Sequence, residues 1–200
     1  MDDKVTAVLD EYHTRMQRER NEREGKNSAD FLDKHMLSVG PDTGPFINLI
    51  ARSMDAPHIL EIGTSFGYSG IWLGDAARAS GGRVTTLELD ASKSAHAKKM
   101  SEKAGLADYV DFQIGDAVEL IGKLSSGVDF VLLDLWKDMY VACLEAFFPK
   151  LNPGAIIVAD NMIYPGGENT ERYGKAVRAK PGINSVLLPV GTGLEISRLS

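Results

Sequence analysis

Apolar residues near the start of the chain recur at the spacing of an α-helix, with charged residues between them. The apolar positions are Val5, Val8, Leu9, Tyr12 and Met16. This pattern predicts an amphipathic helix whose apolar face packs against another element. The stretch that follows, Glu19 to Asn27, is almost wholly polar and is predicted to be a frayed helix end or a linker.

Two further helices are predicted before residue 58. Ser28 can cap a short helix from Ala29 to Leu37. A Gly- and Pro-rich stretch from Gly40 to Pro45 then leads into an apolar helix from Phe46 to Met54. Pro45 can open that helix at its first position, where proline is well tolerated.

From residue 58 onward, predicted strands and helices alternate. The predicted strands are His58–Ile62, Val84–Leu89, Tyr109–Ile114, Phe130–Leu135, Ala155–Asp160, Ser185–Val190 and Leu194–Leu199. The predicted helices between the first six strands are Tyr68–Arg78, Ser92–Ala104, Ala117–Leu124, Tyr140–Lys150 and Arg172–Ala179. The segments Val131–Leu133 and Ile156–Val158 are apolar on both faces, as expected for the covered centre of a parallel sheet.

The last two predicted strands are joined differently from the others. Only Gly191, Thr192 and Gly193 separate them, which is too short for a crossover helix, so they must pair as an antiparallel hairpin. The sequence therefore predicts a doubly wound, Rossmann-like α/β fold with a seven-stranded mixed sheet. We expect residues 55–200 to form it, and the helices of residues 1–54 to pack on or extend it within one structural domain.

Composition excludes several classes of protein. The formal net charge of −6 argues against a nucleic-acid surface, since phosphate binding needs clustered Lys and Arg. No apolar run approaches the ~20 residues needed to cross a bilayer, and the N-terminus is charged rather than signal-like. The single cysteine, Cys143, lies in an apolar stretch, which predicts an inert core thiol and a reducing compartment. We therefore expect a cytoplasmic protein that binds neither nucleic acid nor membrane.

A glycine-rich turn follows the first predicted strand, with the sequence Glu61-Ile62-Gly63-Thr64-Ser65-Phe66-Gly67-Tyr68-Ser69-Gly70. Ligands of open α/β sheets bind at the carboxyl ends of the strands, where this turn lies. Gly63 and Gly67 permit a sharp bend and close approach of a ligand, and the helix N-terminus beyond offers N–H groups to a carboxylate. The GxxxGxxG spacing differs from the GxGxxG of dinucleotide sites, which disfavours NAD. A purely structural turn is the alternative.

Acidic residues follow the second and third predicted strands. Glu88 ends the second strand, where a carboxylate can accept hydrogen bonds from both hydroxyls of a ribose. Asp90 competes for this role, and a solvated acid at a strand end is the alternative interpretation. Asp116 and Ala117 close the third strand, where an adenine edge would lie. Together the three strand ends predict an adenosyl ligand.

Oxygen-bearing side chains also end the fourth and fifth predicted strands. Asp134 ends the fourth strand, and Asp160 with Asn161 ends the fifth. Since adjacent strands lie about 4.8 Å apart, these three side chains converge at one edge of the sheet. Two carboxylates and an amide carbonyl suit Mg²⁺ or another hard divalent cation, with positions left for two substrate oxygens and a water. For a single Asp, capping of the next helix is the alternative.

Lys137 lies one helical step past Asp134. Beside a bound cation and partly buried, its ammonium form would be disfavoured, so that it could accept a proton near neutral pH. The alternative is a surface lysine paired with Asp138. The four histidines show no ligand spacing and are predicted to be surface or packing residues: His13, His35, His58 and His96.

These residues carry a resemblance to the metal-dependent catechol O-methyltransferases, within the larger family that includes caffeoyl-CoA O-methyltransferases. The segment Asp134-Leu135-Trp136-Lys137-Asp138-Met139-Tyr140 is similar to the D-H-W-K-D-R-Y of the catechol enzymes. Asp160-Asn161 and Pro165-Gly166 match their D-N and P-G, and Gly63 to Ser69 resembles their G-A-Y-C-G-Y-S. The resemblance covers roughly residues 36 to 166 and implies the methyltransferase version of the seven-stranded sheet.

The resemblance also implies an activity and a set of site residues. The activity would be metal-dependent transfer of a methyl group from S-adenosylmethionine to a hydroxyl of a catechol-like, vicinal dihydroxy aromatic. The cofactor would contact Val39, Glu61, Gly63, Gly67, Tyr68, Ser69, Glu88, Asp116, Ala117 and Asp134. Mg²⁺ would be held by Asp134, Asp160 and Asn161, with Lys137 as the catalytic base. The substrate would contact His35, Trp136, Lys137, Asn161 and Pro165.

The sequence departs from the catechol pattern at three places. Leu135 replaces a histidine that contacts the adenosyl ligand, and His35 stands about where the catechol enzymes have a second tryptophan wall. The carboxylate that holds the second hydroxyl has no clear counterpart, and Glu195 is the one candidate. These departures leave the identity of the acceptor open.

Other functions are compatible with parts of the sequence. A nicotinamide oxidoreductase could use the glycine turn, and a non-enzymatic protein could bind an adenosyl ligand or a partner. Within methyltransferases, the acceptor could instead be a phenolic antibiotic, a lipid-like phenol or a CoA ester. The first amphipathic helix could pack on its own domain or on a partner subunit, and we expect a homodimer.

Overall fold

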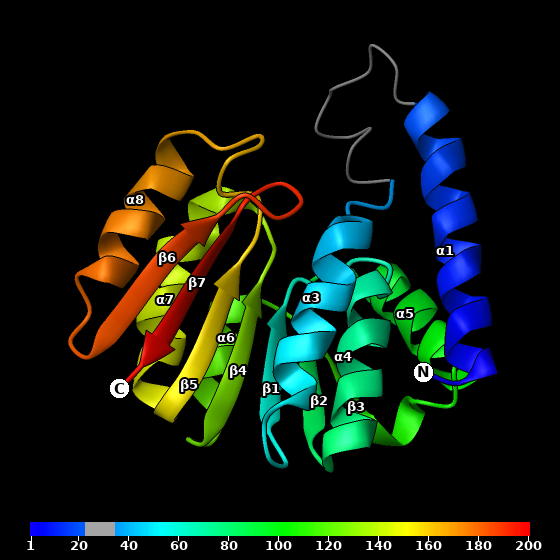
Figure 1. The fold of residues 1–200 in the computed structure, drawn as a ribbon, viewed down its shortest axis with the longest axis horizontal. Coiled ribbons are helices and arrows are strands. Elements are labelled where there is room, and N and C mark those ends of the chain that lie inside the picture. The colour runs from blue at the N-terminus through cyan, green and yellow to red at the C-terminus, as the bar shows by residue number, and fades with distance from the viewer. Residues whose placement is uncertain (23–34) are drawn as a thin grey trace.

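The computed structural model describes residues 1–22 and 35–200, and its centre is a seven-stranded sheet of order β3-β2-β1-β4-β5-β7-β6 (Figure 1). The strands are β1 (His58–Ile62), β2 (Arg83–Glu88), β3 (Val110–Ile114), β4 (Val128–Leu133), β5 (Leu151–Ala159), β6 (Ile183–Leu188) and β7 (Leu194–Leu199). Strands β1 to β5 are parallel, whereas β7 is antiparallel to both β5 and β6. The predicted Rossmann-like sheet with a C-terminal hairpin is confirmed.

Helices cover both faces of the sheet (Figure 1). The group α1 (Asp3–Glu22), α3 (Gly40–Arg52), α4 (Tyr68–Ser80) and α5 (Ala91–Lys103) covers one face. The group α6 (Ala117–Lys123), α7 (Tyr140–Phe147) and α8 (Glu168–Arg178) covers the other. Short 3-10 turns are η1 (Ala107–Tyr109), η2 (Lys137–Met139) and η3 (Phe148–Lys150). Within the described ranges, none of the helices is both long and apolar enough to cross a membrane.

Adjacent residues of the central strands belong to opposite cores. In β4, Phe130 and Leu132 pack on the face that α1, α3, α4 and α5 cover. Val131 and Leu133 pack on the face that α6, α7 and α8 cover. All four side chains are fully buried, and each such burial stabilises the fold by about 1.5–3 kcal/mol. This double coverage explains why the strand is apolar at every position.

Helix α1 is longer than predicted. Its apolar face is buried against α4 and α5 of the same chain, which settles that it packs on its own domain. A frayed end or linker from Glu19 is wrong for residues 19–22, which continue the helix. The physical reason is that Glu19 is buried and accepts hydrogen bonds from Arg15 Nε at 2.5 Å and from Met36 N at 2.6 Å. Residues 23–27 lie outside the described residues. Residues 29–34 of the helix predicted from Ala29 to Leu37 also lie outside the described residues. Residues 35–37, at the end of that predicted helix, are not helical.

Helix α3 begins at Gly40 rather than at the predicted Phe46. Pro41 occupies the first turn, where a missing N–H is tolerated, so Pro45 lies inside the helix and not at its first position. Similarly, α8 begins at Glu168, one turn before the predicted Arg172.

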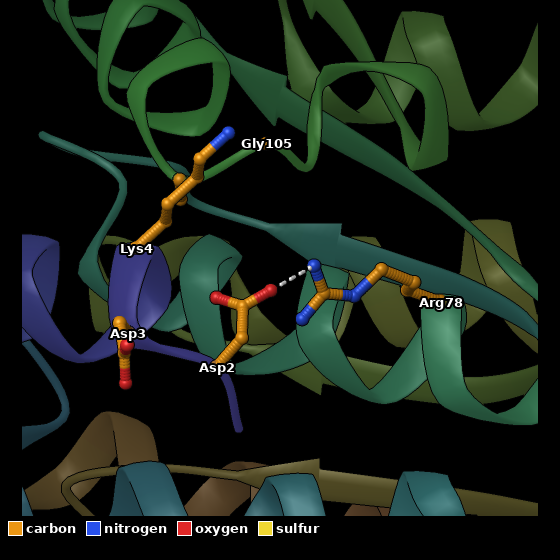
Figure 2. Close-up of a pocket in the computed structure, with 6 residues that line it drawn as sticks. Asp2, Asp3, Lys4, Arg78 and Gly105 are labelled. Carbon is orange, nitrogen blue, oxygen red and sulfur yellow. Dashed lines mark hydrogen bonds and ion pairs between the residues drawn. The ribbon is translucent and has the colours of Figure 1, made fainter.

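The first residues of the chain are held against the end of α4. Arg78 Nη1 donates a hydrogen bond to Asp2 Oδ2 at 2.7 Å, and Arg78 Nη2 donates to Asp75 Oδ1 at 2.8 Å. Figure 2 shows Asp2 and Arg78 pointing toward one another, and together with Lys4 and Gly105 they line a pocket. This pocket lies at the last turn of α4, far along the helix from the glycine turn that precedes it.

Candidate active site

Most of the predicted site residues lie at the carboxyl ends of β1 to β5 or just after them; Val39 and His35 precede α3. The chain passes from β1 to β2 on one side and reaches β4 on the other side. The loops therefore diverge between β1 and β4, which is where open α/β sheets bind their ligands.

The glycine turn is packed tightly against the end of β4. Gly63 has φ +103°, and a Cβ built on it would lie 2.0 Å from the backbone oxygen of Asp134. Gly67 has φ +93°, and its Cβ would lie 2.6 Å from the Cβ of Ala97. Both glycines are thus required by backbone conformation and close packing, and the turn lies directly beside the first predicted metal ligand.

Glu61 is fully buried behind this turn. Its Oε2 accepts a hydrogen bond from Thr86 Oγ1 at 2.5 Å. Burial raises the pKa of Glu61 to about 7, the neighbouring hydroxyls of Ser69 and Thr86 lower it in part, and the charge of Asp134 adds to the rise. No hydrogen bond of ordinary geometry reaches Oε1 within the described residues. Glu61 therefore offers a buried acceptor that a cationic ligand group can satisfy.

Glu88 and Asp90 have different structural roles. Glu88 Oε2 accepts from the backbone N of Ser65 at 2.8 Å, which ties the end of β2 to the glycine turn. Asp90 instead caps α5 by accepting from the backbone N of Ser92 and of Lys93. Of the two acids that competed for the ribose, Asp90 is thus committed to a helix cap.

Asp116 is also a helix cap, since its Oδ1 accepts from the backbone N of Glu119 at 3.0 Å. Two apolar residues near this point were not predicted as site residues. Leu89 is 74% exposed and Ile114 is 55% exposed, and both lie at carboxyl ends of adjacent strands. The sequence does contain a signal for them, because Leu89 directly follows Glu88 and Ile114 lies two residues before Asp116. Their exposed surfaces can cover a flat apolar ligand group.

Asp160 and Asn161 follow β5 beside Asp134. Asp160 is fully buried, and its Oδ1 accepts from Asn161 N and from Thr192 Oγ1, both at 2.7 Å. Its Oδ2 is buried without a hydrogen-bond partner in the described part of the chain. Burial raises the pKa of Asp160, and the Asp134 carboxylate raises it further. Asn161 has φ +58°, a strained conformation often found at functional sites.

This arrangement fits a hard divalent cation. The 3-10 turn after Asp134 has no side-chain cap, so the capping alternative does not account for that residue. Among the described residues, no group of three or more His, Cys, Asp or Glu side chains could hold a metal. The set at this edge is instead two carboxylates and one amide, and an unpartnered buried carboxylate oxygen is stabilised by a cation.

Lys137 lies at the start of η2 and points back to the strand ends. Its Nζ donates to Asp134 Oδ1 at 3.1 Å, Leu135 O at 2.9 Å and Tyr140 Oη at 2.7 Å. Asp134, and not Asp138, is therefore its acidic partner among the described residues. Tyr140 in turn donates to the backbone oxygen of Asp160 at 3.0 Å.

Exposed apolar side chains lie on the segments that follow β4 and β5, close in sequence to these polar groups. Trp136 is 52% exposed, Ile163 is 52% exposed and Tyr164 is 72% exposed, and Pro165 is exposed next to them in sequence. Trp136 and Pro165 were predicted as walls for an aromatic ring, whereas Ile163 and Tyr164 were not. Ile163, Tyr164 and Pro165 are consecutive exposed residues on the loop after β5, and exposed apolar residues gathered in this way often mark a binding site.

Two other predicted residues have partners elsewhere. His35 Nε2 lies 3.8 Å from Glu22 Oε2 at the end of α1. Glu195 is fully buried, and its carboxylate accepts hydrogen bonds from Arg178 Nη2 at 2.6 Å and from Ser185. Both oxygens of Glu195 are thus engaged by the α8 side of the sheet, which gives no support to a contact with a second substrate hydroxyl.

Helix α1 braces the glycine turn, which the sequence did not predict. Tyr12 Oη donates to the backbone oxygen of Phe66 at 2.5 Å, and His13 Nε2 lies 3.0 Å from Tyr68 Oη. The guanidinium of Arg15 lies 3.9 Å from the ring centroid of Phe66, within the range of a cation–π contact. The predicted cofactor residue Val39 is buried at the start of α3, on the same side.

Cys143 is outside this site. It is fully buried on α7, and burial raises the pKa of its thiol to about 12. The prediction of an inert core thiol is confirmed, because the thiolate is the reactive form.

Comparison with known proteins agrees with this geometry. A family model described as O-methyltransferase matches residues 19–199. The chain is 36% identical over 134 residues to a catechol O-methyltransferase of Niastella koreensis, covering 65% of this chain and 60% of the relative. It is 36% identical over 143 residues to a catechol O-methyltransferase of Mycobacterium tuberculosis, covering 70% and 64%. These matches span less than two thirds of the length of either relative.

The fold is similar to that of a solved structure as well. The crystal structure of the O-methyltransferase from Bacillus cereus in complex with SAH superposes with a TM-score of 0.76 and 26% identity, over 100% of this chain and 92% of that one. The strand order, the terminal hairpin and the family model lead to the same conclusion. This chain belongs to the O-methyltransferase family.

Proposed function

We propose that this chain transfers a methyl group from S-adenosylmethionine to one hydroxyl of a vicinal dihydroxy aromatic compound, with the help of a divalent metal. The observation that carries the proposal is the buried, unpartnered Oδ2 of Asp160 beside Asp134 and Asn161. It lies at the same sheet edge as the glycine turn, whose Gly63 contacts the backbone of Asp134. The family supplies the class of reaction.

The cofactor would be held at the ends of β1 and β2. Glu88 would accept from the ribose hydroxyls, and Glu61 with Ser69 would receive the amino-acid end, whose ammonium suits a buried carboxylate. Leu89 and Ile114 would cover the adenine. The sulfonium would supply an electrophilic methyl group. The Bacillus cereus relative that was crystallised with SAH supports an adenosyl cofactor.

The metal would be held by Asp134, Asp160 and Asn161. Bound Mg²⁺ or a similar cation would stabilise the anion of a phenol with a pKa near 10, by about 4 kcal/mol if that pKa falls by about three units. Lys137 Nζ is the proposed acceptor of the hydroxyl proton, and the backbone oxygen of Leu135 and the hydroxyl of Tyr140 hold this atom in place. Trp136 and Pro165 would orient the aromatic ring.

The acceptor class rests on geometry and on the relatives. Three protein ligands leave positions for two substrate oxygens, which favours adjacent hydroxyls. The catechol O-methyltransferases at 36% identity support the same class. A phenolic antibiotic, a lipid-like phenol or a CoA ester is the alternative. A cytoplasmic location and a homodimer are part of the proposal, with the single cysteine supporting the location.

Two experiments test the proposal. Calorimetric titration with S-adenosylhomocysteine and with NAD should give binding of the first alone, and the reverse result would favour an oxidoreductase. A methyl-transfer screen in the presence of Mg²⁺ should then give products with vicinal diphenols. Products only with monohydroxy phenols or hydroxycinnamoyl esters would overturn the acceptor class.

A further inference from the structure

The turn between β6 and β7 contacts the loop that carries two of the proposed metal ligands. Thr192 Oγ1 donates to Asp160 Oδ1 at 2.7 Å and lies 3.0 Å from Asn161 Nδ2. The backbone oxygen of Thr192 accepts from the N of Ile163 at 3.0 Å and from the N of Tyr164 at 2.9 Å. Thr192 lies 31 positions after Asn161 in the chain. It thus forms hydrogen bonds with four residues of this loop.

The hydroxyl of Thr192 has a single proton, so its two contacts have fixed directions. Thr192 Oγ1 donates this proton to Asp160 Oδ1, which also accepts from the backbone N of Asn161. Oγ1 in turn accepts a hydrogen bond from the amide NH₂ of Asn161 at 3.0 Å. The carbonyl oxygen of Asn161 must therefore face away from Thr192, which leaves this oxygen available as a metal ligand.

The same contact determines which oxygen of Asp160 is available. Oδ1 is occupied by Thr192 and by the backbone N of Asn161, whereas Oδ2 has no partner in the described part of the chain. The left-handed backbone of Asn161, at φ +58°, costs free energy and persists only where its surroundings hold it. The N–H groups of Ile163 and Tyr164, two and three residues after Asn161, bind Thr192 O and hold this part of the loop.

We propose that Thr192 is a positioning residue that orients Asp160 and Asn161 for metal binding while contacting neither metal nor substrate itself. This inference rests on the proposed metal-dependent function. Groups that orient metal ligands typically contribute about 10- to 100-fold in metal affinity, and an effect of this size is expected from the loss of the Thr192 hydroxyl.

The test is Mn²⁺ binding to the chain of residues 1–200 loaded with S-adenosylhomocysteine, with free Mn²⁺ measured by electron paramagnetic resonance. Thr192→Val keeps the shape of the side chain and removes the hydroxyl, and it should weaken Mn²⁺ binding about 10-fold or more. Thr192→Ser keeps the hydroxyl and should bind within about 3-fold of wild type, since the same hydrogen bonds can form. The affinity for S-adenosylhomocysteine should be unchanged in both.

Thr85→Val is the matched control. Thr85 is a buried threonine on β2 whose hydroxyl contacts His58 at 3.0 Å, so the chemical change is the same and the site is not involved. It should bind Mn²⁺ as wild type does. If Thr192→Val does not fold, as judged by circular dichroism, Thr192→Ala takes its place with the same expected loss.

The outcomes separate the two proposals. Wild-type Mn²⁺ affinity in a folded Thr192→Val or Thr192→Ala protein overturns the role of Thr192 and leaves the metal-dependent function standing. Failure of Thr192→Ser to restore affinity also overturns it, because packing and not the hydroxyl would then matter. Absence of Mn²⁺ binding to the wild type would contradict the proposed function itself.

Discussion

The Nζ of Lys137 lies 2.7 Å from the hydroxyl oxygen of Tyr140, and this hydroxyl donates in turn to the backbone oxygen of Asp160. Burial raises the pKa of Tyr140 well above its ordinary value, and the charges of Asp134 and Asp160 raise it further, so the group stays a neutral hydroxyl. Lys137 is thereby joined to the loop of Asp160 and Asn161. The proposed proton acceptor and the proposed metal ligands form one hydrogen-bonded unit.

Removal of the lysine should abolish most of the turnover. Lys137→Ala is expected to lower kcat by about 10²-fold or more, because proton removal contributes at least this much to such reactions. Cofactor binding should survive, since the hydrogen bonds of Lys137 Nζ in the described part of the chain go to Asp134, Leu135 and Tyr140 and not to the glycine turn. Steady-state kinetics and titration with S-adenosylhomocysteine measure the two effects. Turnover near the wild-type level would remove Lys137 from the role of base.

Tyr140→Phe tests the link between the lysine and the loop. The change removes one hydrogen-bond partner of Lys137 Nζ. It also leaves the buried backbone oxygen of Asp160 without the hydroxyl that donates to it. We expect about 10-fold lower kcat and a loss of stability of about 1–3 kcal/mol. Urea unfolding and steady-state rates are the measurements.

Tyr173→Phe is the control for this variant. Tyr173 packs edge-on against Tyr140 at 5.4 Å between ring centroids, and its buried hydroxyl has no hydrogen-bond partner among the described residues. Its removal should therefore cost nothing and leave kcat unchanged. Equal losses of kcat in both variants would contradict a specific role of the Tyr140 hydroxyl, because each variant keeps its ring and loses only a hydroxyl.

Gly63→Ala should disrupt the cofactor turn. The new Cβ would lie 2.0 Å from the backbone oxygen of Asp134 at a φ of +103°, so both strain and a backbone clash arise, at about 3 kcal/mol or more. Binding of S-adenosylhomocysteine should be lost. Gly81→Ala has a similar φ of +76° but no atom within 4 Å of its Cβ, and should cost about 1 kcal/mol with binding intact. Equal effects of the two changes on binding would contradict the close packing at Gly63.

Glu61 should make the stability of the cofactor-free protein depend on pH. Its folded pKa is about 7 against an ordinary 4.5, so on raising the pH the unfolded chain loses this proton first. Stability therefore falls between these two pH values relative to a chain without the carboxyl. Glu61→Gln, which keeps an acceptor for Thr86, should exceed wild type by about 3 kcal/mol above pH 7 and match it near pH 4. Urea unfolding across this range is the measurement, and parallel curves for the two proteins would be the contrary result.

Much of the fold follows from local patterns that tertiary contacts reinforce. Strand β1 matches its predicted bounds, His58–Ile62, and all five of its residues are buried. Strand β7 matches Leu194–Leu199 because the Gly191–Gly193 connection sets where it begins. The short Gly191–Gly193 connection could only join antiparallel strands, as it does. Helix starts were less predictable. Helix α3 begins at Gly40 because Pro41 is tolerated in its first turn. The prediction had placed the start of the helix at Phe46 instead.

The candidate site divides in the same way. Asp134 and Asp160 could be placed together because each ends a strand and the two strands are neighbours in the sheet. Thr192 and Tyr12 could not, since their contacts join segments of the chain that only the folded packing of the hairpin and of α1 brings together. Glu19 was predicted to begin a frayed end or linker because a charged residue in a polar stretch is normally exposed. Its burial depends on Met36, which lies 17 positions away in the chain.

The most direct test of the central claim is transfer of a labelled methyl group from S-adenosylmethionine to a vicinal diphenol by the purified chain, measured with Mg²⁺, after EDTA, and after Mg²⁺ is restored. The account predicts a mono-O-methylated product with Mg²⁺, loss of at least about 90% of the rate with EDTA, and recovery on restoration, because the cation stabilises the phenolate. Equal rates with and without EDTA, or no labelled product from any vicinal diphenol, would contradict it.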